Sequence, residues 1–443
     1  QITQQPTVMK LYSTKNPHFE VDLKRAVLEG LPPDNGLYMP QEILPLPQDF
    51  FDRLPQLEFA ELAFEVTRHL LSGAIPEPIL QEIVEQTLSF DAPIHSLSST
   101  LHVLELFHGP TLAFKDFGAR FMARLMAYLI GEDSDPRRLT ILVATSGDTG
   151  GAVANGFLGA PGIEVIILYP QGRVSPLQEK QLTALGQNIT ALEVEGSFDD
   201  CQALVKQAFL DEKLSGQLRL SSANSINIAR LIPQIWYYFR AWQQLDHDQG
   251  PVAFCVPSGN FGNLTGGLMA KKMGLPIAHF IAATNDNDVV PAYLIEGIYR
   301  PRPSVATISN AMDVGSPSNF VRMQALHGDS WEQMRAAISG FHFDDQATRM
   351  AIREVHERFH YQIDPHGAVG YLAAKAFQRR QPDQQVVVLE TAHPAKFPEV
   401  VEMETGQAVR IPERLAILAD QEKVSVPMSK HFQDFSTWLS QKS

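Results

Sequence analysis

Short, continuous runs of apolar residues recur along the chain and alternate with helical patterns. Residues 139–144 form the clearest run, and such a run is typical of a strand buried on both faces. Similar runs predict strands at residues 165–169, 189–194, 252–256, 277–283 and 386–390. Helical patterns at 176–185 and 198–210, a helix of small residues from about 149 and a helix after residue 256 lie between them. The alternation predicts an α/β fold of parallel sheets with helices on both faces, in which ligands bind at the carboxyl ends of the strands.

The first hundred residues have a different pattern. A short strand-like piece is followed by proline and glycine punctuation between Pro32 and Pro40, and helical patterns follow at 59–71 and 79–88. No cluster of reactive side chains lies there, so we expect a mostly helical packing lobe. Residues 1–8 precede Met9-Lys10-Leu11, which reads as the start of the folded chain, and we expect them to be an extension outside the fold.

Composition and charge exclude several classes of protein. The 443 residues are 44% hydrophobic and 19% charged, enough for a large core and more than one domain. The net charge of −14 argues against a nucleic-acid partner, and no apolar run approaches the ~20 residues that span a bilayer. Two cysteines, Cys201 and Cys255, are too few for a disulfide framework, which favours the cytoplasm.

One lysine directly follows an apolar run. Lys115 comes after Leu112-Ala113-Phe114 and opens a helical pattern that repeats every four residues from Phe117 to Leu129. Burial lowers the pKa of a lysine, and the neutral amine can form a Schiff base. The alternative is a lysine whose stem packs on apolar surface while its charge reaches water.

Three glycine-rich or polar clusters follow predicted strands or precede predicted helices. The first contains Thr145, Ser146, Asp148 and Thr149, at a helix N-terminus that suits a carboxylate. The second is the run Ser258, Gly259, Asn260, Phe261, Gly262 and Asn263, whose glycines let the backbone approach a phosphate. The third contains Asn224, Ser225 and Arg230, and the arginine could reach an anion. Helix capping and tight turns are the alternative explanation of each cluster.

The last predicted strand ends before Thr391, whose hydroxyl could face the same crevice. The histidines His108, His366 and His393 are expected to be structural.

With these residues assembled, the chain resembles the threonine synthase family, and within it the larger subtype. The family belongs to the pyridoxal-phosphate (PLP) enzymes of fold type II, which include tryptophan synthase β. The resemblance runs from Met9 to roughly the end of the chain. It rests on motifs at residues 107–118, 144–151, 222–230, 257–263, 309–314 and 391–397.

The resemblance implies a role for each candidate residue. Lys115 would form the Schiff base with pyridoxal 5′-phosphate and shuttle protons. The run from Ser258 to Asn263 would hold the cofactor phosphate, Thr391 would face the pyridine nitrogen, and Asp148 would lie near the phenolic oxygen. The substrate-binding residues would be Thr145, Ser146 and Thr149 for the carboxylate and Asn224, Ser225 and Arg230 for the phosphate. No metal is expected.

The resemblance also implies a reaction and an organisation. O-phospho-L-homoserine and water would give L-threonine and phosphate, in a monomer or weak dimer that binds neither nucleic acid nor membrane. We expect an amino-terminal lobe at 9–100, a large cofactor-binding domain at 101–134 and 231–443, and a small mobile subdomain at 135–230. The alternatives are a related PLP phospho-lyase, a hydroxy-amino-acid dehydratase and a non-catalytic descendant.

Overall fold

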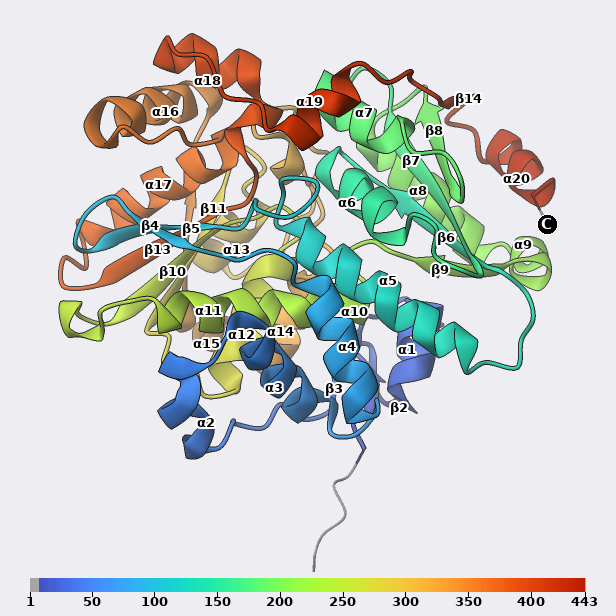
Figure 1. The fold of residues 1–443 in the computed structure, drawn as a ribbon, viewed down its shortest axis with the longest axis horizontal. Coiled ribbons are helices and arrows are strands. Elements are labelled where there is room, and N and C mark those ends of the chain that lie inside the picture. The colour runs from blue at the N-terminus through green and yellow to red at the C-terminus, as the bar shows by residue number, and fades with distance from the viewer. Residues whose placement is uncertain (1–7, 443) are drawn as a thin grey trace, which may run out of the picture.

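The computed structural model describes residues 8–442 and contains two mostly parallel sheets and one small antiparallel sheet (Figure 1). The larger sheet has the order β12 (Ile338–His342), β11 (His279–Thr284), β10 (Val252–Pro257), β13 (Gln385–Glu390), β5 (Leu101–Glu105) and β4 (Ile94–Ser96). The second has the order β14 (Val426–Met428), β8 (Ile189–Val194), β7 (Ile163–Pro170), β6 (Leu139–Ala144) and β9 (Arg219–Ser222). All its pairs are parallel, and in the larger sheet β4 alone pairs antiparallel.

Helices cover both faces of each parallel sheet. In β10, Phe254 packs on Tyr238 of α11 (Trp236–Gln243), with ring centroids 4.9 Å apart. The neighbouring Cys255 points to the opposite face, where its thiol donates to the Gly370 carbonyl of α17 (Pro365–Gln378). Each fully buried side chain of this kind stabilises the fold by about 1.5–3 kcal/mol. The strands are therefore apolar on both faces, as their sequence predicted.

The remaining helices of the larger sheet surround it on the left of Figure 1. They are α12 (Gly262–Lys272), α13 (Val289–Glu296), α14 (Phe320–Leu326), α15 (Trp331–Ala337), α16 (Asp345–Phe359) and α18 (Pro398–Thr405). The second sheet is covered by α6 (Asp148–Phe157), α7 (Pro176–Thr183), α8 (Phe198–Leu210), α9 (Glu212–Gln217) and α20 (Phe432–Ser440). Helix α5 (Lys115–Gly131) packs against α6 and against the short α10 (Ile228–Leu231), so it links the two halves.

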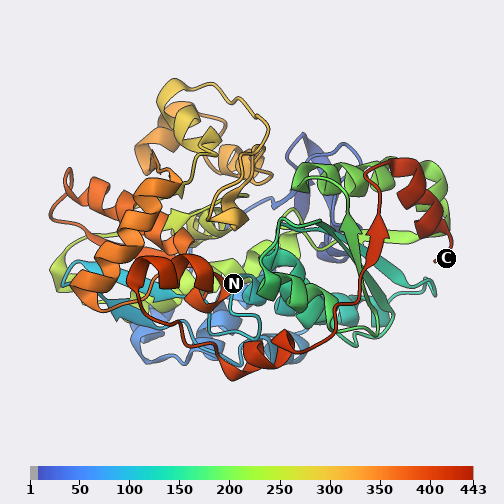
Figure 2. The ribbon, with the colours of Figure 1, turned by 90° about the horizontal axis from the view of Figure 1, so that it is seen from above.

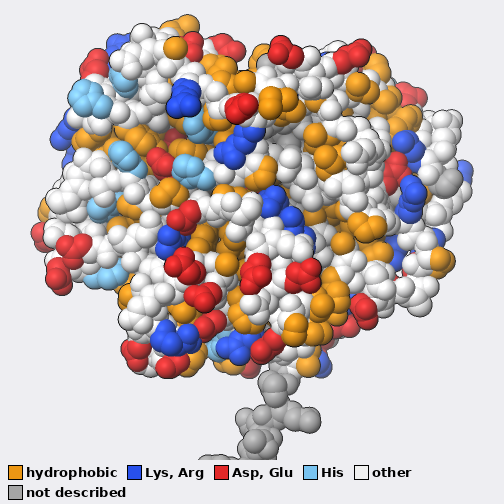
Figure 3. All heavy atoms as spheres, in the orientation of Figure 1, with side chains coloured by type: hydrophobic (Ala, Val, Ile, Leu, Met, Phe, Trp, Pro, Cys, Tyr) orange, Lys and Arg blue, Asp and Glu red, His pale blue; other side chains and the backbone are white. Residues whose placement is uncertain are grey.

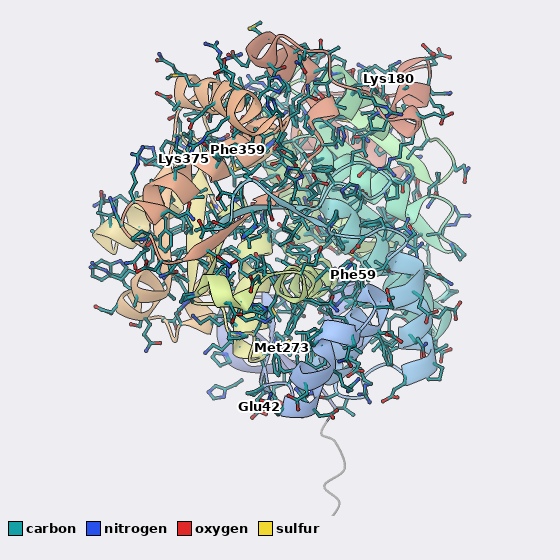
Figure 4. All side chains as sticks on the ribbon, turned by 60° about the vertical axis from the view of Figure 1, so that its left-hand side comes forward. Glu42, Phe59, Lys180, Met273, Phe359 and Lys375 are labelled. Atoms are coloured by element: carbon teal, nitrogen blue, oxygen red, sulfur yellow. The ribbon has the colours of Figure 1, made fainter. Side chains whose placement is uncertain are left out.

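The amino-terminal lobe combines helices with a small sheet. Strands β2 (Asn16–Val21), β1 (Leu11–Ser13) and β3 (Tyr38–Pro40) pair antiparallel, and α1 (Leu23–Glu29), α2 (Gln48–Arg53), α3 (Phe59–Leu71) and α4 (Glu77–Thr87) accompany them. Phe59 of α3, labelled in Figure 4, is buried with its ring centroid 6.2 Å from that of Phe117 on α5. The lobe thus packs on the helix that begins at Lys115.

Two short strands lie across the predicted domain boundaries. β4, within the predicted lobe, joins the larger sheet through β5. β14, within the predicted large domain, pairs with β8 of the second sheet, and the chain crosses from α18 to β14 through α19 (Glu413–Ala419) (Figure 2). Edge strands of three residues carry too few apolar positions to stand out in sequence. The three-domain division itself stays a prediction.

The surface and the chain termini add three observations. Acidic and basic side chains are interspersed on the face shown in Figure 3. Within residues 8–442, no helix is long and apolar enough to cross a membrane, and no group of three or more His, Cys, Asp or Glu side chains could hold a metal ion. The expectation for residues 1–7 lies outside the described residues.

Candidate active site

A cavity that is partly open to solvent lies at the carboxyl ends of strands from both parallel sheets. Ten residues predicted from the sequence line it: Lys115, Thr149, Ser225, Arg230, Gly259, Asn260, Phe261, Gly262, Asn263 and Thr391. Phe114, Gln234, Pro257, Ala311, Met312 and His366 complete the wall.

A short two-stranded bridge positions Lys115 in this cavity. The Phe114 N–H donates to the Thr391 carbonyl (2.9 Å), and the His393 N–H donates to the Leu112 carbonyl (3.0 Å). Leu112 has a φ of +60°, which turns the chain into the bridge at some conformational cost. Lys115 is the first residue of α5, so its amine is fixed to the start of a seventeen-residue helix.

The surroundings of Lys115 favour the neutral amine. Burial lowers the pKa of Lys115 to about 8; the carboxylate of Asp148 opposes this shift, and the charges of Arg230 and Lys396 add to it. The positive end of the α5 dipole also disfavours an ammonium group. A pKa of about 8 leaves about one amine in ten neutral at pH 7, against about three in ten thousand for an ordinary lysine.

The run from Ser258 to Asn263 forms a tight loop between β10 and α12. Ser258 donates its hydroxyl to the Asn263 side-chain carbonyl, and the Asn263 amide donates to the Pro257 carbonyl (2.9 Å), so these two side chains hold the loop in shape. A Cβ on Gly259 would lie 2.9 Å from the Ala311 carbonyl oxygen, closer than real Cβ atoms come. Phe261, with φ +62°, leads into the N-terminus of α12. A backbone loop that ends at a helix N-terminus is suited to a phosphate.

Arg230 supplies a buried cation with a free donor. Its Nη1 donates to the Ala223 carbonyl (2.5 Å), whereas its Nε has no hydrogen-bond partner within residues 8–442. A Cβ at Gly118 of α5 would lie 2.8 Å from that Nε, so the glycine lets the arginine lie against the helix. Burial lowers the Arg230 pKa to about 10. An unpaired buried donor is costly, and an anion in the cavity would satisfy it.

Five of the predicted residues do not line the cavity: Thr145, Ser146, Asp148, Asn224 and Ser258. The Thr145 hydroxyl accepts hydrogen bonds from the N–H groups of Gly147 (3.0 Å) and Gly150 (2.8 Å). The Asn224 amide donates to the Ala144 carbonyl (2.7 Å) and accepts from the Ala144 N–H (3.2 Å), which joins the ends of β9 and β6. Ser146 is partly buried and does not line the cavity.

Asp148 is buried and forms an ion pair that the sequence analysis missed. Its Oδ1 lies 2.5 Å from Nζ of Lys396 and accepts from the Gln178 amide (3.0 Å). Burial raises the pKa of Asp148, but the neighbouring charges of Lys396 and Lys115 outweigh it and hold the pKa below its usual range. The signal was present, because Lys396 follows an apolar Pro394-Ala395 pair as Lys115 follows Phe114.

A second missed residue is His366, which is buried on α17 at the cavity wall. Its Nδ1 lies 2.5 Å from Asp364 Oδ2, and its Nε2 accepts from the Ala311 N–H (3.2 Å). His393, in contrast, accepts from the Ala395 N–H (3.0 Å) and caps the short helix η5 (Pro394–Lys396). The helical position of His366 is what turns it toward the cavity.

The residues present fit pyridoxal 5′-phosphate. The cofactor requires a neutral amine, a phosphate cradle and a cavity that excludes bulk water, and the structure brings Lys115, the loop at Gly259 and Arg230 to one cavity. Fold and site together define the class: a PLP-dependent enzyme built on two parallel sheets. The family model described as "Pyridoxal-phosphate dependent enzyme" matches residues 86–392.

Further comparisons identify the family within this class. The models described as "Threonine synthase N terminus" and "Threonine synthase, C-terminal" match residues 10–88 and 367–436. Threonine synthase of Escherichia coli (strain K12) is 44% identical over 425 residues, 96% of each chain, and that of Pseudomonas aeruginosa is 35% identical over 98% of each chain. The chain belongs to the threonine synthase family.

Solved structures of threonine synthases have the same fold as this chain. The crystal structure of threonine synthase from Escherichia coli has a TM-score of 0.92 at 43% identity and covers 98% of this chain and 100% of that one. PLP-bound threonine synthase from Brucella melitensis has a TM-score of 0.89 at 36% identity, with coverage of 98% and 99%. Maize serine racemase, at 16% identity and a TM-score of 0.53, shares the fold. These matches confirm the predicted fold class, family and cofactor.

Proposed function

We propose that this protein converts O-phospho-L-homoserine and water to L-threonine and phosphate. The observation that carries the proposal is the meeting of Lys115 with the unpartnered Nε of Arg230 in one cavity. A reactive amine alone would suit many PLP enzymes. A buried guanidinium with a free donor, separate from the loop that suits the cofactor phosphate, favours a substrate with a second phosphate.

The loop from Ser258 to Asn263 would hold the cofactor phosphate, and the Thr391 hydroxyl would face the ring nitrogen. A hydroxyl partner leaves that nitrogen uncharged, which moderates the electron sink and favours elimination and replacement. The cofactor, when bound, supplies the electron sink that carbanion chemistry requires. Asp148 does not line the cavity, and its carboxylate forms an ion pair with Lys396. Its predicted place near the phenolic oxygen of the cofactor stays a prediction.

Thr149, Ser225 and Arg230 line the cavity and would bind the substrate. Arg230 would pair with the substrate phosphate, and Thr149, at the N-terminal turn of α6, would bind its carboxylate. The predicted contact of Ser146 with that carboxylate stays a prediction, because Ser146 lies off the cavity wall. We assign Thr145 and Asn224 a positioning role, because their polar atoms are already bonded to backbone groups.

Lys115 would move the protons. Its neutral amine accepts the proton from the substrate Cα and serves the transfers at Cβ that accompany loss of the γ-phosphate and addition of water at Cβ. Arg230 keeps the departing phosphate charge-paired. The predicted small subdomain, residues 135–230, would close over the cavity to control water. The amide of Asn310 donates to the Gln178 side-chain carbonyl (3.1 Å), a contact between the two halves that supports such closure.

The test is a Lys115→Ala variant compared with Lys272→Ala, which removes an exposed lysine at the far end of α12. Lys115→Ala should lose the visible absorbance of the bound cofactor and form no threonine, while the control keeps both. Products are read as threonine, phosphate and 2-oxobutanoate. Release of 2-oxobutanoate in place of threonine by the unmodified protein would indicate a lyase or dehydratase, and cofactor absorbance without any product would indicate a non-catalytic descendant.

The setting of the reaction belongs to the same proposal. Both cysteines are free and buried, which agrees with a reducing cytoplasm. The protein would act as a monomer or weak dimer, and sedimentation at several concentrations tests this.

A further inference from the structure

A buried ion pair is hydrogen-bonded to the loop that leads to the reactive amine. The side chains of Asp148 and Lys396 are 4% and 0% exposed, and their charged atoms are 2.5 Å apart. Lys396 Nζ also donates to the Thr111 carbonyl (3.0 Å), four residues before Lys115. The pair thus connects α6 and η5 to the loop that presents the amine.

Burying two charges is expensive, and the mutual attraction of such a pair often only offsets the loss of hydration. Here a helix dipole and several hydrogen bonds support the ion pair. Asp148 lies at the N-terminus of α6, where the helix dipole favours a carboxylate, and it accepts from Gln178. The Thr111 carbonyl receives a second hydrogen bond, from the Gln181 amide (3.1 Å). The arrangement is therefore built into three elements.

The charges that act on Lys115 come from three sides. Asp148 on α6 favours its ammonium form, whereas Arg230 on α10 and Lys396 on η5 disfavour it. On α5 itself, the carboxylate of Asp116 is occupied by the Thr111 N–H (2.9 Å) and hydroxyl (2.6 Å). On α17, a protonated His366 would lower the pKa of Asp148. Without Lys396, the Asp148 carboxylate would favour the ammonium form of Lys115 with less opposition.

We propose that Lys396 is a positioning residue, which offsets the charge of Asp148 and anchors the Thr111 carbonyl so that the Lys115 amine gives up its proton more readily and stays fixed in the cavity. The inference rests on the proposed role of Lys115 as the reactive amine. It gives Lys396 a function that does not require contact with substrate or cofactor.

The experiment measures the ionisation of Lys115 in the full-length, cofactor-free protein. Competitive acetylation at a series of pH values, read by mass spectrometry of the Lys115 peptide, gives the pH of half-maximal reactivity. Lys396→Met should raise this midpoint by about 1 to 2 pH units, because an uncompensated carboxylate nearby favours the ammonium form. Labelling of Lys115 at pH 7 should then be about tenfold slower or more.

A charge-matched set keeps the result interpretable. Asp148→Asn should shift the midpoint in the opposite direction, because the Lys396 charge then acts alone, and the double variant Asp148→Asn/Lys396→Met should return close to the unmodified protein. An unchanged midpoint in Lys396→Met, or an upward shift in Asp148→Asn, would overturn the proposal. If Lys396→Met does not fold, the downward shift in Asp148→Asn and its reversal in the double variant decide the question.

Failure of the proposed function gives a different signature. A Lys115→Ala variant that still forms threonine would refute the role of Lys115, whereas the midpoints of the acetylation series would still report whether the ion pair controls its charge.

Discussion

Replacing Gly259 with alanine should weaken cofactor binding through a single methyl group. A Cβ at this position would lie 2.9 Å from the Ala311 carbonyl oxygen, 3.0 Å from Met312 Cα and 3.0 Å from Val314 Cγ2. Two of these atoms are backbone, so they cannot swing away as a flexible side chain would. Overpacking of this kind costs about 1–3 kcal/mol.

The loop forms part of the cavity wall, so it can shift outward in the cofactor-free protein and relieve the contact. Binding must then restore the original loop, and the cost appears in affinity. A loss of about 1–3 kcal/mol corresponds to a Kd for pyridoxal 5′-phosphate raised about 5- to 150-fold. The assay is an absorbance titration of cofactor-free protein, with a thermal melt of the same sample.

Gly131→Ala is the matched control. A Cβ there meets nothing within 4 Å, and the residue ends the helix that Lys115 begins. Its Kd should be unchanged. Equal Kd and equal melting temperature for Gly259→Ala and the unmodified protein would refute the view that the loop needs glycine to hold a phosphate.

Three further outcomes are expected. Arg230→Met should lower kcat/KM for phosphohomoserine about 10- to 150-fold, because it removes one charge-assisted hydrogen bond to the substrate. An absorbance titration should show the cofactor still bound, and an equal loss of kcat/KM and of cofactor binding would make Arg230 structural. Asn224→Ala should lower the free energy of unfolding by about 1–3 kcal/mol in a denaturant titration with little change in KM, because it removes the amide that joins β6 and β9. The rate at which cofactor-free protein takes up pyridoxal 5′-phosphate should rise with pH and reach half its maximum near pH 8, since only the neutral Lys115 amine reacts; a flat profile from pH 6 to 8 in stopped-flow absorbance would contradict this.

Hydrophobic pattern predicted the central strands because they are buried on both faces. The runs at 139–144 and 189–194 coincide with β6 and β8, and the predicted helices at 59–71 and 198–210 coincide with α3 and α8. The pattern failed where a strand is short or mixed. β12 has one buried residue in five, and β14 contains Pro427 at the edge of its sheet. Such strands are defined by the neighbour they pair with, which sequence periodicity does not contain.

The site could be located from sequence because a parallel sheet brings the residues after its strands to one edge. That argument places a residue at the edge and leaves its side-chain direction open. Thr145 follows a predicted strand and Asn224 precedes a predicted helix, yet their polar atoms turn back to the Gly147 and Ala144 backbones. Lys396 and His366 are 0% and 1% exposed, and only the tertiary structure shows that His366 lines the cavity and that Lys396 pairs with Asp148.

The charges around Lys115 explain how a buried carboxylate can act on an amine that must give up its proton readily. Desolvation, the α5 dipole and the Arg230 charge all disfavour the ammonium form, so the site already lowers the Lys115 pKa without Lys396. Asp148 holds the Lys396 amine in place through the ion pair, and the same amine donates to the Thr111 carbonyl. The Lys396 charge in turn offsets the effect of the Asp148 carboxylate on the Lys115 pKa. The effects of the two residues on Lys115 therefore oppose each other. For this reason the double variant is expected to restore the pH midpoint of Lys115 acetylation that either single variant shifts.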